Sequence, residues 1–166
     1  MLCAETARPG EYAVAMVFLP TRRQLAERCR KLLERTVETE GCEVLGWRKV
    51  PTVSSGLGTL AKSTEPVVNQ LFIGRGSIAQ SRFEQKLYVI RRIVEKAAAG
   101  WKTDCSQFYI TSISSRIIVY KGLLTGTQLP EYYPDLLHPA LKSAFALLHQ
   151  RFSTNTLPSW NLAQPF

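Results

Sequence analysis

A chain of 166 residues with a formal net charge of +8 suits one domain, and 45% hydrophobic residues are enough for a sizeable core. Charged residues at 20% argue against disorder, and no apolar run approaches the roughly 20 residues that span a bilayer, so we expect no membrane partner. The stretches TRRQLAERCRKLLER and VIRRIVEK carry many of the bases but intersperse them with acids at helical periodicity. They are interpreted as the solvated faces of two surface helices, and no nucleic-acid partner is predicted.

The N-terminal residues and the cysteines indicate the cellular compartment in which the chain is expected. MLCAETARPGEY lacks the apolar region of a secretory signal peptide, so we expect the cytoplasm, or an organelle reached by a signal that this chain does not show. The cysteines are Cys3, Cys29, Cys42 and Cys105, with no C-x-x-C pair. A chain of this length needs no disulfides, and the spacing of a metal site is absent, so reduced thiols and no metal are expected.

Apolar runs that end at proline or glycine predict strands in the first half of the chain. The runs rich in β-formers are Glu11–Leu19, Cys42–Val50 and Pro66–Gly74. The segment between the last two runs is harder to interpret, because it mixes Ser, Thr, Gly and Pro with a few apolar residues. It is predicted to be loop with a short helix around Leu57–Ser63.

Two longer segments have apolar residues at helical spacing and predict amphipathic helices. The first follows Thr21 and stops at Gly41, and the second opens at Ser81. Thr21 with Gln24, and Ser81 with Glu84, have the spacing of a capping box, in which two side chains satisfy backbone donors of the first turn. The residues expected to be buried are Leu25, Cys29, Leu32, Leu33 and Val37 in the first helix, and Phe83, Leu87, Ile90, Val94 and Ala97 or Ala98 in the second.

The second half of the chain is predicted to contain a hairpin. QFYITSIS and RIIVYKG have strand composition and are joined around Ser114–Arg116. The loop LTGTQLPEYYPDLLHP has too many prolines for a regular element, whereas LKSAFALLHQRF fits a helix or a strand by pattern and is counted as a further strand. Hairpins among alternating strands and helices favour a mixed or antiparallel sheet with helices packed on it, an α+β fold.

The segment HQRFSTNTLPSW, from His149 to Trp160, places a guanidinium where the last apolar run ends. Arg151 is always charged, so it needs an anion or several acceptors. Its planar fork suits a carboxylate held by two parallel hydrogen bonds, and Thr154 could donate its hydroxyl to the same oxygens. On chemistry alone, an α-carboxylate site and a structural role for Arg151, paired with an Asp or Glu at the core edge, are equally good interpretations.

That segment, extended to HQRFSTNTLPSWNLAQPF, resembles the glutaminase domain of the glutamate synthase large subunit, a class-II glutamine amidotransferase. Five further stretches resemble that domain in the same order: EYAVAMVFLP, VLGWRKVP, FEQKLYVIRR, FYITSISSRIIVYKGLL and LPEYYPDL. Residues 1–166 are therefore taken as one partial amidotransferase type-2 domain. The resemblance implies the four-layer αββα fold of the N-terminal nucleophile hydrolases, incomplete at both ends. It also implies that Arg151 binds the glutamine α-carboxylate and that Thr154 helps to hold that end of glutamine.

The catalytic groups of the family have no counterpart in this sequence. The family's nucleophile is a cysteine at the mature N-terminus, followed by a Gly-rich string, whereas Cys3 is followed by Ala-Glu-Thr. The His-Asn-Gly-Glu string, which supplies the oxyanion-hole donors, is also absent. No catalytic residue is therefore expected, and the chain is predicted to be an internal fragment that is inactive alone.

The resemblance implies further components for the full-length enzyme. Glutamine would be hydrolysed to glutamate and ammonia, and the ammonia would pass to a synthase domain of the same polypeptide for glutamate synthesis from 2-oxoglutarate. That domain would use FMN and an iron–sulfur cluster, with electrons from a small electron-donating subunit or ferredoxin, and no cofactor site is expected in this chain. A photosynthetic source would place the enzyme in a plastid. The alternative is a non-catalytic small basic α+β binding or scaffold protein.

Overall fold

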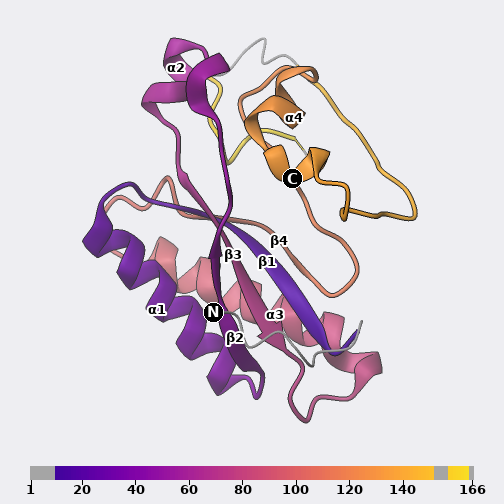
Figure 1. The fold of residues 1–166 in the computed structure, drawn as a ribbon. Coiled ribbons are helices and arrows are strands. Elements are labelled where there is room, and N and C mark those ends of the chain that lie inside the picture. The colour runs from indigo at the N-terminus through magenta and orange to yellow at the C-terminus, as the bar shows by residue number, and fades with distance from the viewer. Residues whose placement is uncertain (1–9, 152–156, 165–166) are drawn as a thin grey trace.

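The computed structural model describes residues 10–151 and 157–164, which build one antiparallel sheet with helices (Figure 1). The sheet has four strands in the order β2-β3-β1-β4. Its strands are β1 (Tyr12–Leu19), β2 (Glu43–Lys49), β3 (Val67–Gly74) and β4 (Tyr109–Ser114). An antiparallel sheet with helices packed on it is what the sequence predicts, and each of these strands lies where a strand was expected.

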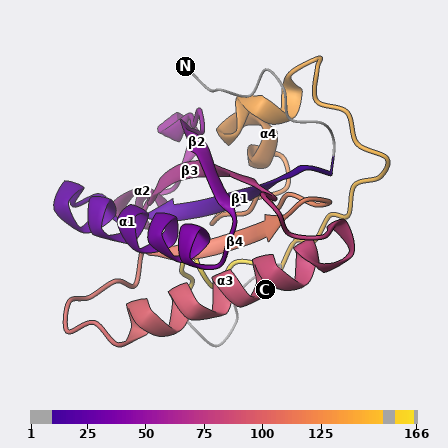
Figure 2. The same cartoon turned by 90° about the horizontal axis from the view of Figure 1, so that it is seen from below.

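Two helices cover one face of the sheet, as Figure 2 shows from below. Helix α1 (Arg23–Thr39) connects β1 to β2, and α3 (Gln80–Ala99) connects β3 to β4. This element order and strand order are those of the split βαβ arrangement of ferredoxin-like folds. None of the helices in the described part of the chain is long and apolar enough to cross a bilayer.

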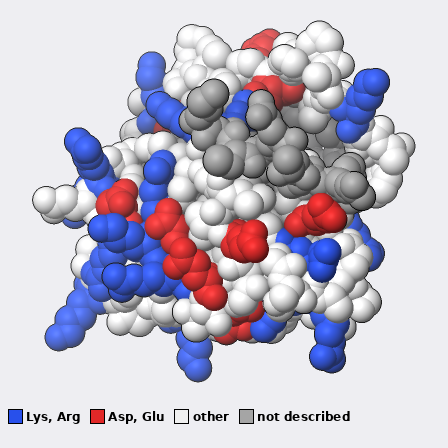
Figure 3. All heavy atoms as spheres, turned by 60° about the horizontal axis from the view of Figure 1, so that its bottom comes forward, with Lys and Arg blue, Asp and Glu red and all other residues white. Residues whose placement is uncertain are grey.

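The main core lies between the sheet and these two helices. Ala13, Ala15 and Val17 of β1 alternate toward the helices, since successive strand residues point to opposite faces. The helices bury Leu25, Cys29, Leu33, Thr36 and Val37 from α1, and Phe83, Leu87, Ile90, Val94 and Ala98 from α3. The helical stripes predicted from the sequence are thus confirmed, except that Leu32 is only half-buried and Thr36 is buried beside it. Basic and acidic side chains lie side by side over the outer surface of this layer (Figure 3).

Short elements from two distant regions cover the opposite face of the sheet. From the β2–β3 connection come η1 (Ser54–Gly56) and α2 (Thr59–Ser63), and from the segment after β4 come α4 (Gln128–Tyr132) and η2 (Pro134–Leu137). They pack with the sheet into a second cluster, formed by Met16, Phe18, Val50, Ala61, Val68, Tyr132, Tyr133 and Trp160. The predicted short helix before the third strand is confirmed. The Pro-rich segment LTGTQLPEYYPDLLHP was predicted to be a loop without a regular element, and this prediction is wrong because α4 and η2 form there.

Both predicted capping boxes are wrong, because distant partners take the groups involved. Helix α1 begins at Arg23 without a side-chain cap, and the backbone N–H of Thr21 donates to Gln107 Oε1 at 3.3 Å. Helix α3 begins at Gln80, also without one. Its Glu84 instead accepts hydrogen bonds of 2.6–2.9 Å from Ser114, the last residue of β4, and from Ser115.

The predicted hairpin after β4 and the last predicted strand are also wrong for the described residues. β4 ends at Ser114, and the segment that follows does not pair with it as a strand. The N–H of Val119 donates instead to a side-chain hydroxyl of β4, Ser112 Oγ, at 3.1 Å. Residues 141–151 contain no helix or strand, and Leu147 in them is 90% exposed. The described residues therefore form one sheet, and the second sheet of the expected four-layer arrangement is not among them.

Candidate functional site

Of the two residues predicted to bind a carboxylate, Arg151 and Thr154, the structure describes only Arg151. Arg151 is exposed at the end of the irregular segment 141–151, and Thr154 lies outside the described residues. The buried strand expected before Arg151 is not present, so the cost of burying a guanidinium does not arise there. His149 is likewise exposed. An exposed guanidinium is accessible to an anion from solution, and its role stays a prediction.

On either side of residues 152–156, a nearby residue contacts the rest of the fold. On the N-terminal side, Gln150 Oε1 accepts a hydrogen bond of 3.1 Å from the N–H of Gly126. On the C-terminal side, Trp160 is buried, and its Nε1–H donates to the carbonyl of Ala61 at 2.9 Å. The Trp160 ring also contacts Phe18 edge-on, with ring centroids 5.9 Å apart. Trp160 is therefore a packing residue of the second core cluster.

Lys121 lies beside Trp160 and is a polar residue that the sequence analysis did not single out. It is 2% exposed, and its Nζ donates to the carbonyl of Asn161 at 3.0 Å and lies 4.4 Å from the ring centroid of Tyr109. Burial, with a smaller contribution from Arg91, lowers the pKa of Lys121 to about 8. A lysine inside the apolar run RIIVYKGLL was the available signal, because a charged residue in such a run is rarely buried without partners.

An ion pair fixes η2 against the sheet. Arg48 on β2 binds Asp135 through two hydrogen bonds of 2.6 and 2.7 Å, and Arg48 Nη1 also donates to Gln70 Oε1 at 2.9 Å. The hydrogen bonds from Arg48 lower the pKa of Asp135 despite its partial burial. Tyr120 adds a longer hydrogen bond to the same carboxylate, at 3.4 Å. This network places Tyr120, and with it Lys121, over the face of the sheet away from α1 and α3.

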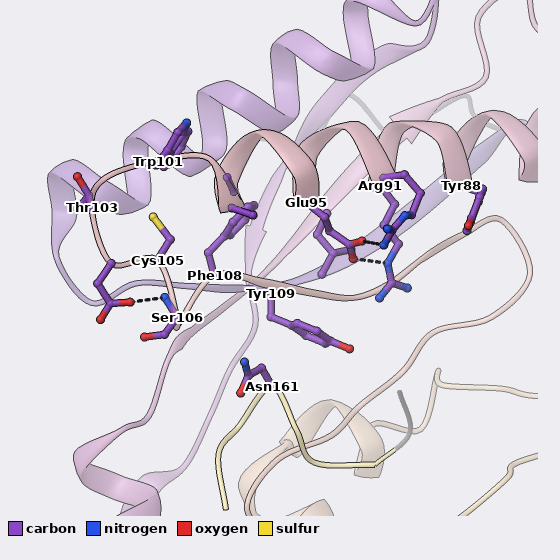
Figure 4. A pocket seen from close by; sticks show the side chains of 15 residues that line it. Tyr88, Arg91, Glu95, Trp101, Thr103, Cys105, Ser106, Phe108, Tyr109 and Asn161 are labelled. Atoms are coloured by element: carbon purple, nitrogen blue, oxygen red, sulfur yellow. Dashed lines mark hydrogen bonds and ion pairs between the residues drawn. The ribbon is translucent and has the colours of Figure 1, made fainter.

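A pocket of about 780 Å³ lies between α3, the loop before β4, and the C-terminal segment (Figure 4). Arg91 and Arg92 on α3 both bind Glu95, at 2.8 and 2.6 Å. Tyr109 and Asn161 line the side of the pocket nearest Lys121. Its charged groups on α3 are thus engaged with one another, and the wall made by Asn161 belongs to the segment that follows the predicted carboxylate site.

The thiols in the described residues are poorly suited to be nucleophiles. Burial raises the pKa of Cys29 to about 12 and also raises those of Cys42 and Cys105. A nucleophilic cysteine needs a lowered pKa, because the thiolate is the reactive form. Cys3 lies outside the described residues. Within residues 10–151 and 157–164, no group of three or more His, Cys, Asp or Glu could hold a metal ion, so these residues do not fit an iron–sulfur cluster.

Comparison with known proteins gives consistent matches along the chain. The family model "Glutamine amidotransferases class-II" matches residues 3–166. The NADPH glutamate synthase large chain of Azospirillum brasilense is 42% identical over 96% of this chain, and that of Bacillus subtilis is 46% identical over 93%. The chloroplastic ferredoxin-dependent glutamate synthase of Spinacia oleracea is 42% identical over 92%. The chain spans 9–11% of the length of these three relatives.

Proposed function

Because this chain belongs to the class-II glutamine amidotransferases, we propose that it forms part of the glutamine-hydrolysing domain of a glutamate synthase large chain. The observation that carries the proposal is the family match over residues 3–166, joined to relatives that are 42–46% identical and named glutamate synthase. The surface is consistent with it, since the bases of the helical layer are mixed with acids and do not form the single-sign patch of a nucleic-acid site.

The proposed reaction is hydrolysis of the glutamine side-chain amide. A cysteine thiol attacks the amide carbon, ammonia leaves, and water then hydrolyses the thioester to give glutamate. The match covers about a tenth of each relative, and we assign the nucleophile and the Asn-Gly oxyanion donors to the remainder of the larger polypeptide. The same remainder would supply the second sheet of the four-layer fold, covering exposed apolar residues such as Leu147.

The role proposed for this chain is to hold the amino-acid end of glutamine. The guanidinium of Arg151 would bind the α-carboxylate through two parallel hydrogen bonds, with Thr154 adding its hydroxyl to the same group. Support comes from the exposure of Arg151, which leaves its guanidinium accessible, and from the neighbouring Gln150, whose side chain accepts a hydrogen bond from the N–H of Gly126.

The remaining components follow from the same proposal. Ammonia would pass to a synthase domain of the same polypeptide, and FMN and an iron–sulfur cluster there would supply electrons for glutamate formation from 2-oxoglutarate. A small electron-donating subunit or ferredoxin would be the partner, as the names of the NADPH-dependent and ferredoxin-dependent relatives suggest. The location would be the cytoplasm, or a plastid in a photosynthetic eukaryote, as for the chloroplastic relative of Spinacia oleracea.

The test is Arg151→Lys in the full-length enzyme, with Arg82→Lys as the matched control at an exposed position on α3. Losing one of two charge-assisted hydrogen bonds to the carboxylate costs about 1.5–3 kcal/mol of binding free energy, so the KM for glutamine should rise roughly 10- to 100-fold. Glutamate synthesis from added ammonia should stay unchanged, because it does not require glutamine binding. An unaltered glutamine KM in Arg151→Lys would show that the carboxylate role is wrong.

A further inference from the structure

We propose that Cys29 and Cys105 form a redox-sensitive pair, in which a small-molecule disulfide such as oxidised glutathione converts the two thiols into an intramolecular disulfide. The bond would join α1 to the loop between α3 and β4, residues 100–108. This modification site lies apart from the segment proposed to bind glutamine, and it does not depend on the proposed function.

The loop is held against α1 by contacts on both sides of Cys105 in the sequence. Before it, the ring of Trp101 lies against α1, with its centroid 3.8 Å from the guanidinium carbon of Arg28. After it, Gln107 Oε1 accepts a hydrogen bond of 3.3 Å from the backbone N–H of Thr21, which lies just before α1. These two contacts hold the middle of the loop, and with it Cys105, against the helix.

The two thiols are neighbours inside this contact. Cys29 is fully buried in the main core, and the half-buried Cys105 packs against the same core. Burial raises the pKa of both thiols, and a side-chain hydrogen bond between them also contributes to the pKa of each. Both are free thiols in this structure. Two neighbouring thiols can be joined with little movement of the backbone, whereas distant ones cannot.

An oxidant reaches the pair through Cys105. The Cys105 side chain lines the pocket of about 780 Å³ together with Trp101 and Phe108, and Figure 4 shows it on the loop that closes one end of that pocket. Cys29 is 0% exposed, so it is not accessible to a molecule in solution. Cys105 is therefore the thiol that reacts first, and Cys29 is the thiol that completes the bond.

The reaction consists of two thiol–disulfide exchanges. The Cys105 thiolate attacks one sulfur of oxidised glutathione, whose S–S bond breaks and releases one glutathione, which takes up a proton. The Cys29 sulfur then loses its proton and attacks the Cys105 sulfur of the mixed disulfide, which releases the second glutathione. The two cysteine sulfurs are thus oxidised, and one small disulfide is reduced to two thiols.

The raised pKa values make the pair slow to oxidise and also slow to reduce. Little of Cys105 is thiolate at neutral pH, and the thiolate is the attacking species. The same property protects the product, because a thiol of high pKa is a poor leaving group when a reductant attacks the disulfide. We therefore expect a bond that forms over minutes to hours and then persists.

Disulfide mapping in the full chain carrying Cys3→Ser tests the pairing, because this variant leaves only Cys29, Cys42 and Cys105. The chain is equilibrated with oxidised glutathione at pH 8, free thiols are blocked, and linked peptides are identified by mass spectrometry. A parallel sample in concentrated urea is the control. Cys29 is 13 positions from Cys42 and 76 from Cys105, so closure of the shorter loop favours the Cys29–Cys42 pair in urea by roughly tenfold.

In the folded chain this ratio should be reversed, with Cys29 linked to Cys105. Cys42 is 5% exposed, and no other cysteine contributes to its pKa, so it should stay a free thiol. The disulfide should also raise the melting temperature by about 5–15 °C, because it closes a long loop in the unfolded chain. Cys105→Ser cannot form the bond and should melt at the same temperature before and after treatment with oxidised glutathione.

Two results would overturn the proposed pair. One is a folded chain in which Cys105 remains a free thiol, or a mixed disulfide with glutathione, under conditions that oxidise the chain in urea. The other is the same ratio of linked pairs in the folded and the urea-treated samples. If the chain does not fold alone, mapping of the same peptides in the intact larger polypeptide decides on the same two criteria.

Discussion

At the scale of single residues, Arg151 and Lys121 are two cationic side chains in different environments. Arg151 is exposed, whereas Lys121 is 2% exposed and bonded to Asn161. The first was predicted from the sequence because an arginine among hydroxyl residues suits a carboxylate. The second was not, because the sequence does not show that Tyr109, Tyr133 and Asn161 converge on one lysine. That convergence depends on contacts between residues far apart in the chain.

Burial of Lys121 should make stability depend on pH. Its pKa is about 8 in the fold, below the ordinary 10.5, so the unfolded chain binds more protons between these values. The free energy of unfolding should therefore rise between about pH 8 and 10.5, and this contribution is lost as pH falls through 8. Arg91 on α3 and Tyr109 on β4 lie near the amine, and the carbonyl of Asn161 accepts its hydrogen bond.

Urea unfolding of the unsubstituted chain and of Lys121→Met, measured from pH 7 to 10, isolates this contribution. Methionine cannot titrate, so the unsubstituted chain should gain about 1–3 kcal/mol relative to the variant across that range. All other ionisable groups are present in both proteins and cancel in the difference. Parallel stability curves would contradict a lowered pKa for Lys121.

At the scale of elements, local patterns could be predicted and side-chain partners at element ends could not. The strands and the buried stripes of α1 and α3 follow from apolar periodicity, which is a local property. The helix starts depend on Gln107 and on Ser114, distant groups that take the place of a capping box. Helix α4 forms despite Pro130, because proline is tolerated in the first turn of a helix.

The site was predicted less completely than the fold, for a related reason. The strand expected before Arg151 rested on an apolar run, yet Phe145 and Leu147 in that run are 76% and 90% exposed. An apolar run predicts burial only when a partner surface is present to cover it. The described residues do not include one for this run, and its pairing remains part of the proposed function.

The ion pair between β2 and η2 gives an element-scale prediction. Asp135→Asn keeps the shape of the side chain but removes the charge bound by Arg48, so it should destabilise the chain by about 1–2 kcal/mol. Hydrogen bonds from Arg48 lower the pKa of Asp135, so its contribution is present at neutral pH and is lost as pH falls through that lowered pKa. The loss should thus disappear in acid.

Thermal unfolding of Asp135→Asn and the unsubstituted chain at pH 7 and pH 2 measures this difference. Glu131→Gln on α4 is the control, since it neutralises an exposed carboxylate of the neighbouring element. Equal melting temperatures for Asp135→Asn and the unsubstituted chain at pH 7 would show that the ion pair does not stabilise the contact of η2 with the sheet.

At the scale of the whole molecule, the described residues form one sheet, and we propose that the chain supplies one end of a binding site. Its helical face is closed by the main core, whereas the opposite face is covered by short elements and by the segment that ends at Trp160. We expect the remaining parts of the site to come from a larger polypeptide, because the relatives are about ten times as long.

Continuous sequencing of the genomic DNA on both sides of this reading frame tests whether the chain is part of a complete glutamine-hydrolysing domain. We expect a Cys-Gly string in frame upstream and a His-Asn-Gly-Glu string in frame downstream, which together would supply the nucleophile and the oxyanion donors. A start signal and a stop signal placed directly at these ends, with neither string in frame, would contradict it. The family match would then describe the ancestry of the chain and not a working glutaminase.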